Sequence, residues 1–478
     1  MSSIITSLRV LWKNRFTTLI NIAGLSVGIA SCLFIFMFVQ NELSYDKHHA
    51  KHERIYRVVS DLSLGGEDDK SGMSSFMLSP TLKADYPEVE EAVRLMPLGK
   101  QTMWVADKPY QFNDNLMSDG GFFSIFDYEF VDGDPKTALT QPQSVVITDE
   151  AALKMFGTTT DILGKMIRYA RQSYAITGVV KDKKDLSHLY FNTIVSLSSL
   201  QPQMENTLKN DWFYLAQTNY ILLNKETGGA AFESKLAELR NKYIVPWLKQ
   251  VNSEGKITFR LQPLTQIHLS NEYPAGYTKA GSRSYIYIFS LLAVFILIIA
   301  CINYINLAIA TSGKRAKEIG IRKTAGASTA SLFRQFITES VLIVVQAVLL
   351  SLLWVQALLP LFNSITEKSL HVPYSFSLAG CLFLLIVIIG FVAGSYPALY
   401  LSRMQPALVL KSNKLPAGFS VWLRKALVVL QFFIAVSFMI CTIVVYAQVN
   451  FIKQKDMGFN KDQVLVVSVP VQDTSFVS

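Results

Sequence analysis

The stretch Thr311-Ser-Gly-Lys-Arg-Ala-Lys-Glu-Ile-Gly-Ile-Arg-Lys-Thr-Ala-Gly-Ala-Ser328 decides the fold, because it separates two long apolar segments, Tyr285–Ala310 and Phe336–Pro360. It is basic throughout and contains one acid, Glu318. Lysine and arginine near the ends of membrane spans resist translocation. We therefore expect the stretch to lie in the cytoplasm, between two spans.

The pattern inside this stretch also indicates a partner. Ile319 and Ile321 alternate with charged residues, while Gly320 and Gly326 keep one side slim. Such a segment is typical of a helix that lies along the membrane surface and docks to a soluble protein. A basic anchor that only sets the topology is the alternative. The predicted contact residues are Lys317, Glu318, Ile319, Gly320, Ile321, Arg322, Lys323 and Gly326.

Apolar runs elsewhere predict a membrane protein with about five spans. Half of the 478 residues are hydrophobic, which is at the upper end for a soluble domain. The predicted spans are 16–41, 285–310, 335–360, 376–401 and 426–451, each long enough to cross about 30 Å of hydrocarbon. Segments 1–15, 311–334 and 402–425 are basic and are predicted to be cytoplasmic. This placement accounts for the net charge of +9 without a nucleic-acid partner.

The N-terminal segment 1–15 predicts an amphipathic helix at the membrane surface. Leu8, Leu11 and Trp12 recur at helical spacing, while Arg9 and Lys13 face away from them. A signal peptide is the competing interpretation. The apolar run at 16–41 is too long for one, and no clear cleavage site follows it.

Residues 42–284 predict an α+β domain outside the cytoplasm. The four cysteines all fall in apolar spans, so this domain folds without disulfides. Two strand–helix–strand patterns occur in it, at about 54–96 and 218–264. They predict one subdomain that is interrupted by an insertion at about 101–200. Leu236 and Leu239 are expected to face its core.

A few polar residues within the spans are expected to serve helix packing. Asn303 and Asn306 share one helix face, Glu339 lies near the membrane interface, and Pro397 is expected to kink or end its helix. Interhelical hydrogen bonding is the favoured role of the two asparagines, and a transport site is the alternative.

Motifs for catalysis or metal binding are absent from the sequence. No phosphate-binding loop of the form G-x-x-x-x-G-K-[ST] occurs, so ATP is expected on a partner protein. His48, His49 and His52 precede a strand near the membrane. A hydrated segment is favoured there over a zinc site. No catalytic, cofactor-binding or metal residue is therefore predicted.

The end of the chain repeats the order of its beginning. A basic segment, a span and residues 452–478 follow one another as segments 1–15, 16–41 and the first outer strand do. Residues 452–478 are therefore expected to begin a second outer domain, as in a fragment of a longer protein.

Taken together, these pieces resemble the MacB/FtsX/LolC-type ABC transporter permeases. The similarity in the membrane part is carried by 303–307, 314–328, Glu339, 394–398 and Pro406. In the outer part it is carried by Ser44-Tyr-Asp46, Arg54-Ile-Tyr-Arg57, Phe122–Asp127, Gly133-Asp-Pro135, Ser144–Thr148, Gly164-Lys165 and Ile176–Asp182. The family's outer domain has a βαβ Porter part with an inserted Sabre part. Because this chain adds a fifth span and the start of another outer domain, it resembles the front half of the family's tandem, eight-span bacterial version.

The resemblance implies a transporter membrane subunit that is not itself an enzyme. A cytoplasmic ABC ATPase would bind the basic stretch and move the outer domains of a permease dimer in the bacterial inner membrane. This motion would export a periplasmic substrate such as a drug, a peptide or a lipoprotein, and a periplasmic adaptor or an outer-membrane duct would be a further partner. One alternative is an FtsX-like regulator of a periplasmic or cell-wall enzyme, and another is a membrane receptor without an ATPase.

Overall fold

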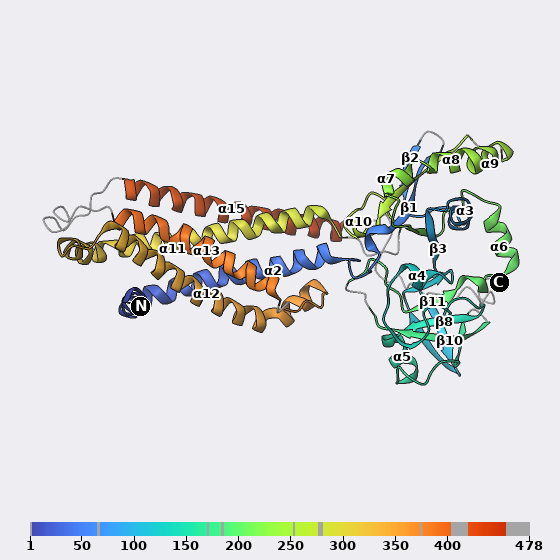
Figure 1. The fold of residues 1–478 in the computed structure, drawn as a ribbon, viewed down its shortest axis with the longest axis horizontal. Coiled ribbons are helices and arrows are strands. Elements are labelled where there is room, and N and C mark those ends of the chain that lie inside the picture. Colours follow the sequence, from blue (N-terminus) through green and yellow to red (C-terminus); the bar gives the residue numbers. More distant parts are fainter. Residues whose placement is uncertain are drawn as a thin grey trace. The chain divides into compact units, whose positions relative to one another are not determined.

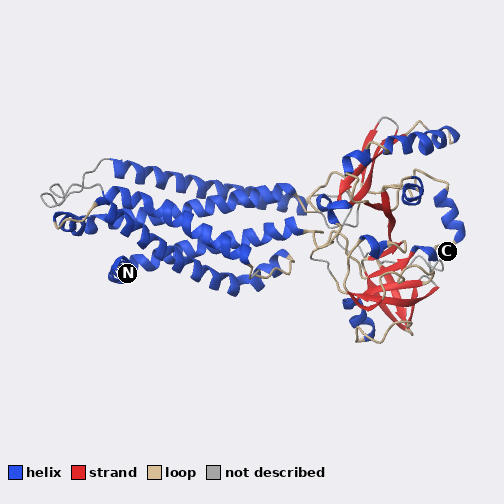
Figure 2. Ribbon diagram, in the orientation of Figure 1, coloured by secondary structure: helices blue, strands red, loops and turns tan. Residues whose placement is uncertain are grey.

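The computed structural model describes residues 2–64, 67–169, 172–182, 186–251, 254–275, 281–372, 375–402 and 419–455 (Figure 1). It divides into a helical unit, up to Gln40 and from Ile286 onward, and an α/β unit, Asn41–Tyr285. Most of the predicted cytoplasmic segment 402–425 and of the second outer domain at 452–478 lies outside the described residues. The predicted fold class, membrane helices with an α+β domain, is confirmed (Figure 2).

The helical unit is built from long apolar helices. They are α1 (Ser2–Lys13), α2 (Arg15–Ser44), α11 (Arg283–Thr324), α12 (Thr329–Thr366), α13 (Phe376–Ser402) and α15 (Phe419–Gln454). Among the described residues, α2, α11, α12 and α15 contain four segments that are long and apolar enough to span a membrane. In α13 the apolar stretch Leu378–Val392 is shorter.

The helix that contains the second predicted span is longer than the span itself. Its membrane-spanning segment ends at Thr311, next to the predicted residue 310. The helix α11 continues to Thr324, so the predicted loop 311–334 is reduced to the turn between α11 and α12. Residues 311–324 contain no proline, and a helix needs no apolar residues to continue into water. The helix α13 ends at Ser402, one residue beyond the predicted end of the fourth span at 401, so Pro397 does not end its helix.

Small residues bring the helices of this unit close together. A side chain on Gly28 of α2 would place its Cβ 2.8 Å from Ala300 of α11, and one on Gly390 of α13 would meet Val341 of α12 at 2.8 Å. Close backbone approach of this kind is the usual way in which membrane helices gain packing energy.

The α/β unit contains one sheet of 13 strands among the described residues. Its strands are β1 (Ile55–Leu64), β2 (Glu67–Ser71), β3 (Val89–Pro97), β4 (Gln101–Val105), β5 (Lys108–Phe112), β6 (Asn115–Ser118), β7 (Phe130–Gly133), β8 (Ser144–Thr148), β9 (Met166–Tyr169), β10 (Gln172–Val180), β11 (Thr193–Ser196), β12 (Thr218–Leu223) and β13 (Lys256–Pro263). The order is β13-β1-β12-β3-β6-β11-β8-β10-β9-β4-β5, with β2 on β1 and β7 on β10. Its helices are α3 (Leu78–Asp85), α4 (Phe122–Ile125), α5 (Asp149–Phe156), α6 (Pro202–Lys209), α7 (Gly229–Glu233), α8 (Leu236–Leu239), α9 (Val245–Gln250) and α10 (Leu264–Ile267).

The two predicted strand–helix–strand patterns interlock in this sheet. β1 lies between β13 and β12, and β12 lies between β1 and β3, with every one of these pairings antiparallel. Each pattern thus has a strand of the other between its own two strands, which is the split βαβ arrangement. The strands β4 to β11 of the insertion continue the sheet through β6, which pairs with β3. The predicted interrupted subdomain is confirmed.

The helix predicted within the second strand–helix–strand pattern, 218–264, is broken, although the side that was predicted to face the core does so. Leu236 and Leu239 are 2% and 0% exposed, as expected. A π-helical turn, Arg240–Ile244, follows α8. The five-residue step from Leu239 to Ile244 keeps both side chains in the core, because a π turn lengthens the repeat by about one residue.

The segment with the histidines is partly buried in the α/β unit. His49 is fully buried, and its Nδ1 accepts a hydrogen bond from the Asp127 amide at 2.9 Å. Tyr45 and Asp46 are buried as well, whereas His48 and His52 are half-buried and Lys47, Ala50 and Glu53 are exposed. The prediction of a hydrated segment is therefore wrong at His49. Polar residues next to a span resemble solvent-facing residues in sequence, but here they bond to loops of the insertion.

Candidate coupling site

The basic stretch folds as the tip of a helical hairpin. At the end of α11 the Ala327 amide donates to the Arg322 carbonyl and the Gly326 amide to the Lys323 carbonyl, both at 3.0 Å. These two bonds form a Schellman motif, which places Gly326 at the left-handed position, with φ of 94°. Ser328 then caps α12 by accepting from the Ser331 amide at 3.2 Å.

Gly326 is required here for its backbone conformation. A Cβ at this position would meet nothing within 4 Å. No residue in the described part of the chain packs against Gly326, and its predicted contact with a partner stays a prediction. Gly320, by contrast, is buried within α11.

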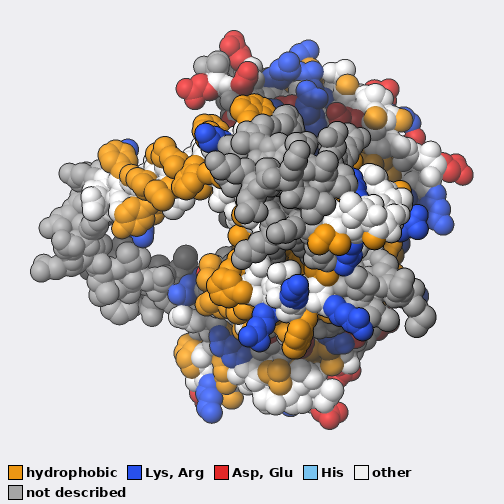
Figure 3. Space-filling view, turned by 90° about the vertical axis from the view of Figure 1, so that its left-hand side faces the viewer, with side chains coloured by type: hydrophobic (Ala, Val, Ile, Leu, Met, Phe, Trp, Pro, Cys, Tyr) orange, Lys and Arg blue, Asp and Glu red, His pale blue; other side chains and the backbone are white. Residues whose placement is uncertain are grey.

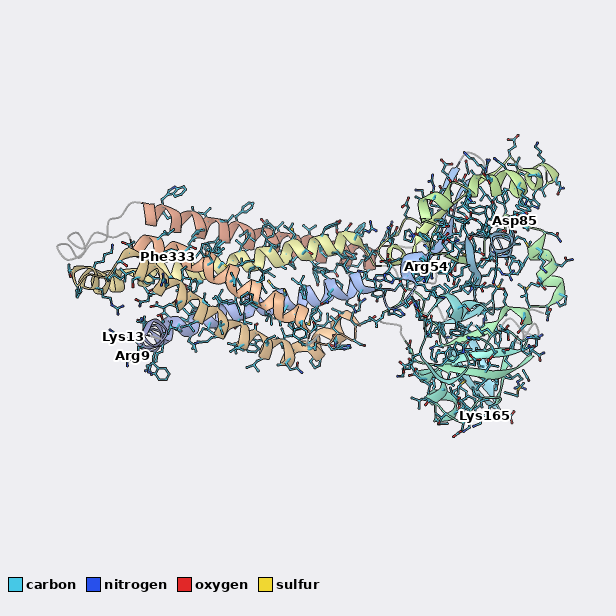
Figure 4. All side chains as sticks on the ribbon, in the orientation of Figure 1. Arg9, Lys13, Arg54, Asp85, Lys165 and Phe333 are labelled. Carbon is cyan, nitrogen blue, oxygen red and sulfur yellow. The ribbon has the colours of Figure 1, made fainter. Side chains whose placement is uncertain are left out.

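The two isoleucines of the stretch have different surroundings. Ile319 is 5% exposed and packs against Leu332 and Phe336 of α12, and Phe333 (Figure 4) covers the edge of this cluster. Ile321 is 57% exposed. Because successive helix residues point about 100° apart, only one of the two can face α12. Ile319 therefore closes the hairpin, and Ile321 is the one available to a partner.

A polar relay joins the two helices beside this cluster. The Arg322 guanidinium donates to Gln335 Oε1 at 3.1 Å, and Gln335 Nε2 donates to Glu339 Oε1 at 3.0 Å. Glu339 is 4% exposed. Gln335 and Glu339 both belong to α12, so this bond lies within one helix, and the helix-packing role of Glu339 stays a prediction. Gln335 gave no signal in the sequence, because a neutral amide on a helix reads as surface.

A second polar contact lies further along the hairpin. Tyr304 Oη and Ser340 Oγ are 2.7 Å apart and both side chains are buried. Ser340 also faces α13, where a Cβ on Gly394 would lie 2.7 Å from its Oγ. Asn303 is exposed, and Asn306 Oδ1 is buried without a hydrogen-bond partner among the described residues. Tyr304 therefore makes the interhelical bond expected of the asparagines.

The remaining predicted residues are less well placed. Lys323 is partly buried, and the side chains of Lys317, Glu318 and Pro397 lie outside the described residues. Figure 3, the view from the end of the helices that carries the hairpin, shows Lys and Arg side chains beside hydrophobic ones.

Two small cavities adjoin the hairpin. One of about 20 Å³ is lined by Val10 of α1, Ile319, Arg322 and Glu339. Another of about 60 Å³ adds Asn21, whose buried Oδ1 has no hydrogen-bond partner among the described residues. Both cavities are large enough for water and too small for a drug-sized ligand.

The α/β unit contains a buried pair of an aspartate and a histidine. Asp46 and His188 are both 0% exposed, with 2.9 Å between Asp46 Oδ2 and His188 Nδ1. Asp46 Oδ1 also accepts from Ser187 Oγ at 2.8 Å and from the His188 amide at 3.1 Å. Burial alone would raise the pKa of Asp46, but the facing His188 and these hydrogen bonds outweigh it and lower that pKa below its ordinary value.

A second buried pair and an open cleft complete the polar features of this unit. Glu42 Oε2 lies 2.9 Å from His268 Nε2, and Tyr45 stacks on the same imidazole with ring centroids 3.5 Å apart. On the insertion, a cleft of about 250 Å³ is lined by Asp114, Lys154 and Tyr190, among others. The described residues contain no group of three or more His, Cys, Asp or Glu that could hold a metal ion.

Comparison with known families identifies both units. Residues 18–239 match the MacB-like periplasmic core domain, and residues 289–406 match the FtsX-like permease C-terminal domain. The chain belongs to the MacB/FtsX-type family of ABC transporter permeases. It is a multi-pass protein of the inner membrane with a periplasmic domain, the α/β unit. Helices α2 and α11 connect this domain to the helical unit, and the cytoplasmic placement of the hairpin stays a prediction.

Several curated proteins are related to this permease. The pyoverdine export ATP-binding/permease protein PvdT of Pseudomonas savastanoi pv. phaseolicola is 22% identical over 85% of this chain and 58% of its own length. The macrolide export ATP-binding/permease protein MacB of Psychrobacter arcticus is 20% identical over 70% of this chain and 45% of its own. The chain thus spans about half the length of the curated relatives it matches.

Solved structures of outer domains are also similar. A domain of a putative permease from Porphyromonas gingivalis shares 19% identity, covering 51% of this chain and 98% of that domain, with a TM-score of 0.40. The periplasmic region of MacB from Actinobacillus actinomycetemcomitans shares 14% identity, covering 43% and 88%, with a TM-score of 0.31.

Proposed function

We propose that this permease couples ATP hydrolysis by a partner ATPase to movements of its periplasmic domain, and that these movements export a periplasmic substrate such as a drug, a peptide or a lipoprotein. The observation that carries the proposal is the unbroken helix α11. It begins where the chain leaves the periplasmic domain and ends at the tip of the hairpin.

The hairpin has the stiffness that such coupling requires. Tyr304 and Arg322 bond to α12 at two heights on α11. They are separated by about 27 Å at a rise of 1.5 Å per residue. Between these bonds, Ile319 packs against Leu332 and Phe336 of α12. A helix held at two separated points resists bending, so a push on the tip moves the whole rod.

The tip also has a surface suited to a partner. Ile321 supplies an exposed apolar side chain next to Arg322, and Thr324, Ala325 and Gly326 are exposed and small. An apolar side chain that fills a pocket contributes more to binding than the charges around it, because exposed ion pairs add only about 0–1 kcal/mol each. We assign this surface to a cytoplasmic ABC ATPase, with a second permease copy completing the transporter and with an adaptor or duct as its periplasmic partners.

Replacing Ile321 by glutamate tests the docking surface. Ile321→Glu should abolish co-purification of the ATPase with the full chain, since it places a charge where an apolar contact forms. The matched control is Ile365→Glu, because Ile365 is 72% exposed at the periplasmic end of α12. Equal ATPase recovery from both variants would remove this surface from consideration.

Replacing Tyr304 by phenylalanine tests the stiffness separately. Tyr304→Phe removes the bond to Ser340 and leaves the tip unchanged. We expect the ATPase to bind normally while export per ATP hydrolysed falls several-fold in the reconstituted complex. Unchanged export per ATP would show that the rigidity of the hairpin is not what transmits the motion.

A further inference from the structure

The joint between α1 and α2 carries an exposed surface that is half basic and half apolar. Trp12, Phe16 and Leu19 are 80%, 76% and 67% exposed. Arg9, Lys13 and Arg15 are exposed beside them. No acidic residue occurs before Glu42, so nothing within this segment neutralises the three charges.

The geometry of the joint places this surface at the level of the lipid headgroups. α1 is seen nearly end-on in Figure 1 while α2 runs lengthwise, so α1 lies across the bundle. Leu11 and Ser7 are buried and turn one side of α1 inward, where α1 packs against α12. Arg9 and Lys13, one helical turn apart, lie at the outer end of the bundle (Figure 4).

We infer that this joint is a binding site for anionic phospholipid headgroups of the cytoplasmic leaflet. Basic residues close to such a leaflet gain about 1 kcal/mol each from its negative surface potential, which corresponds to about a five-fold preference per residue. Trp12 is suited to the interface, because its indole has an apolar body and a polar N–H.

The apolar half of the surface decides between a lipid and a protein partner. Phe16 and Leu19 belong to α2, and their exposed side chains continue the surface that this membrane-spanning helix presents to lipid. A soluble protein that covered Arg9 and Lys13 would not reach these residues inside the bilayer. A phospholipid satisfies both halves, with its acyl chains on the aromatic residues and its phosphate on the basic ones.

A lipid bound at this site would affect the coupling hairpin, because α1 contacts both. Val10 of α1 shares the wall of the smaller cavity with Ile319 and Arg322, and the hydroxyl of Thr18 in α2 donates to the Leu11 carbonyl at 3.2 Å. A headgroup bound to the outer side of α1 therefore holds its inner side against the hairpin. This consequence rests on the proposed function, whereas the lipid site itself does not.

Tryptophan quenching by brominated lipids in nanodiscs tests the site on the full chain. The chain has six tryptophans. In a background with Trp354→Phe and Trp422→Phe, Trp12 is the tryptophan left in the helical unit. Brominated phosphatidylglycerol should quench it more strongly than brominated phosphatidylcholine at the same mole fraction, and high salt should reduce the difference.

Charge removal should eliminate this preference. We expect it to fall by about five-fold for each of Arg9→Gln, Lys13→Gln and Arg15→Gln, while Arg9→Lys keeps it. The matched control is Lys453→Gln with Lys455→Gln, two exposed basic residues in the last turn of α15 and directly after it. Equal quenching by the two lipids, or a preference that survives in the triple variant, overturns the assignment. Neither of these two measurements depends on the ATPase, so the test of the lipid site is separate from the test of the coupling proposal.

Discussion

Removing the carboxylate of Asp46 should cost the periplasmic domain a large part of its stability. Asp46 is fully buried and bonded to Ser187 and to both the amide and the ring of His188. Breaking a buried pair by removing one partner costs about 3–5 kcal/mol, against a total of about 5–15 kcal/mol for a typical domain. Asp46→Ala should therefore lose at least roughly a fifth of the free energy of unfolding, and a larger share if the domain is less stable. Asp46→Asn, which keeps one acceptor oxygen, should lose about 1.5–3 kcal/mol.

The pH dependence follows from the lowered pKa of Asp46. A carboxyl whose pKa is lower in the folded than in the unfolded state contributes stability above its unfolded pKa, about 3.9. That contribution is lost as the pH falls through the folded pKa. The difference in stability between the natural domain and Asp46→Asn should therefore be full at pH 6–7 and shrink below about pH 4.

Urea unfolding of the α/β unit, followed by tryptophan fluorescence, measures both effects. With an m-value of about 3 kcal/mol/M, a loss of about 3–5 kcal/mol in Asp46→Ala should lower the midpoint by about 1–1.7 M. Asp68→Asn is the control, because Asp68 is exposed on β2 and should leave the midpoint almost unchanged. A loss below about 1 kcal/mol for Asp46→Ala, or a difference that stays constant down to pH 2.5, would refute this account of the pair.

Three further predictions concern the hairpin, the core and the topology. Gly326→Ala should lower the melting temperature of the full chain, because alanine at φ of 94° costs about 1–2 kcal/mol. Gly380→Ala is the control and should leave the melting temperature unchanged, since Gly380 also has no neighbour within 4 Å. Equal melting temperatures of the two variants would contradict the Schellman turn. Leu239→Asp should unfold the periplasmic domain, as circular dichroism would show, because Leu239 is 0% exposed and a carboxylate there has no partner; a folded variant with normal melting would mean that α8 turns another face inward. Lys317→Cys should resist a membrane-impermeant maleimide added to spheroplasts, and Lys108→Cys in β5 should react; efficient labelling at position 317 would reverse the topology.

Patterns with a strong period were sufficient to predict the membrane spans and the interrupted α/β subdomain. Apolar runs longer than a bilayer require helices. The spacing of Leu236 and Leu239 in the sequence was enough to predict which side of their helix faces the core. The split arrangement of β1, β12, β3 and β13 follows from two similar units that share one sheet.

The details of the coupling site could not be predicted, because they depend on the neighbouring helix. Ile319 and Ile321 are the same residue type and both lie among charged residues, so the sequence does not distinguish them. The rotation of α11 about its axis relative to α12 decides that Ile319 is buried and Ile321 is exposed. Gln335 carries no charge and acquires its role from Arg322 across the hairpin. The burial of His49 likewise depends on Asp127, which is distant in sequence. Contacts of this kind leave no local pattern.

The length of α11 beyond the bilayer has an electrostatic consequence. Its apolar part ends near Ala310, and the helix continues to Thr324, which extends it by at most about 21 Å. The headgroup layer takes up about 5–8 Å of this distance, and beyond it the field of the lipids decays over about 8 Å at physiological ionic strength. Val10 of α1 lines one cavity with Ile319 and Arg322, so the basic residues of α1 and the tip of the hairpin lie side by side in this decaying field. Recruitment of a nucleotide-hydrolysing subunit should therefore change with ionic strength together with the binding of lipid to α1.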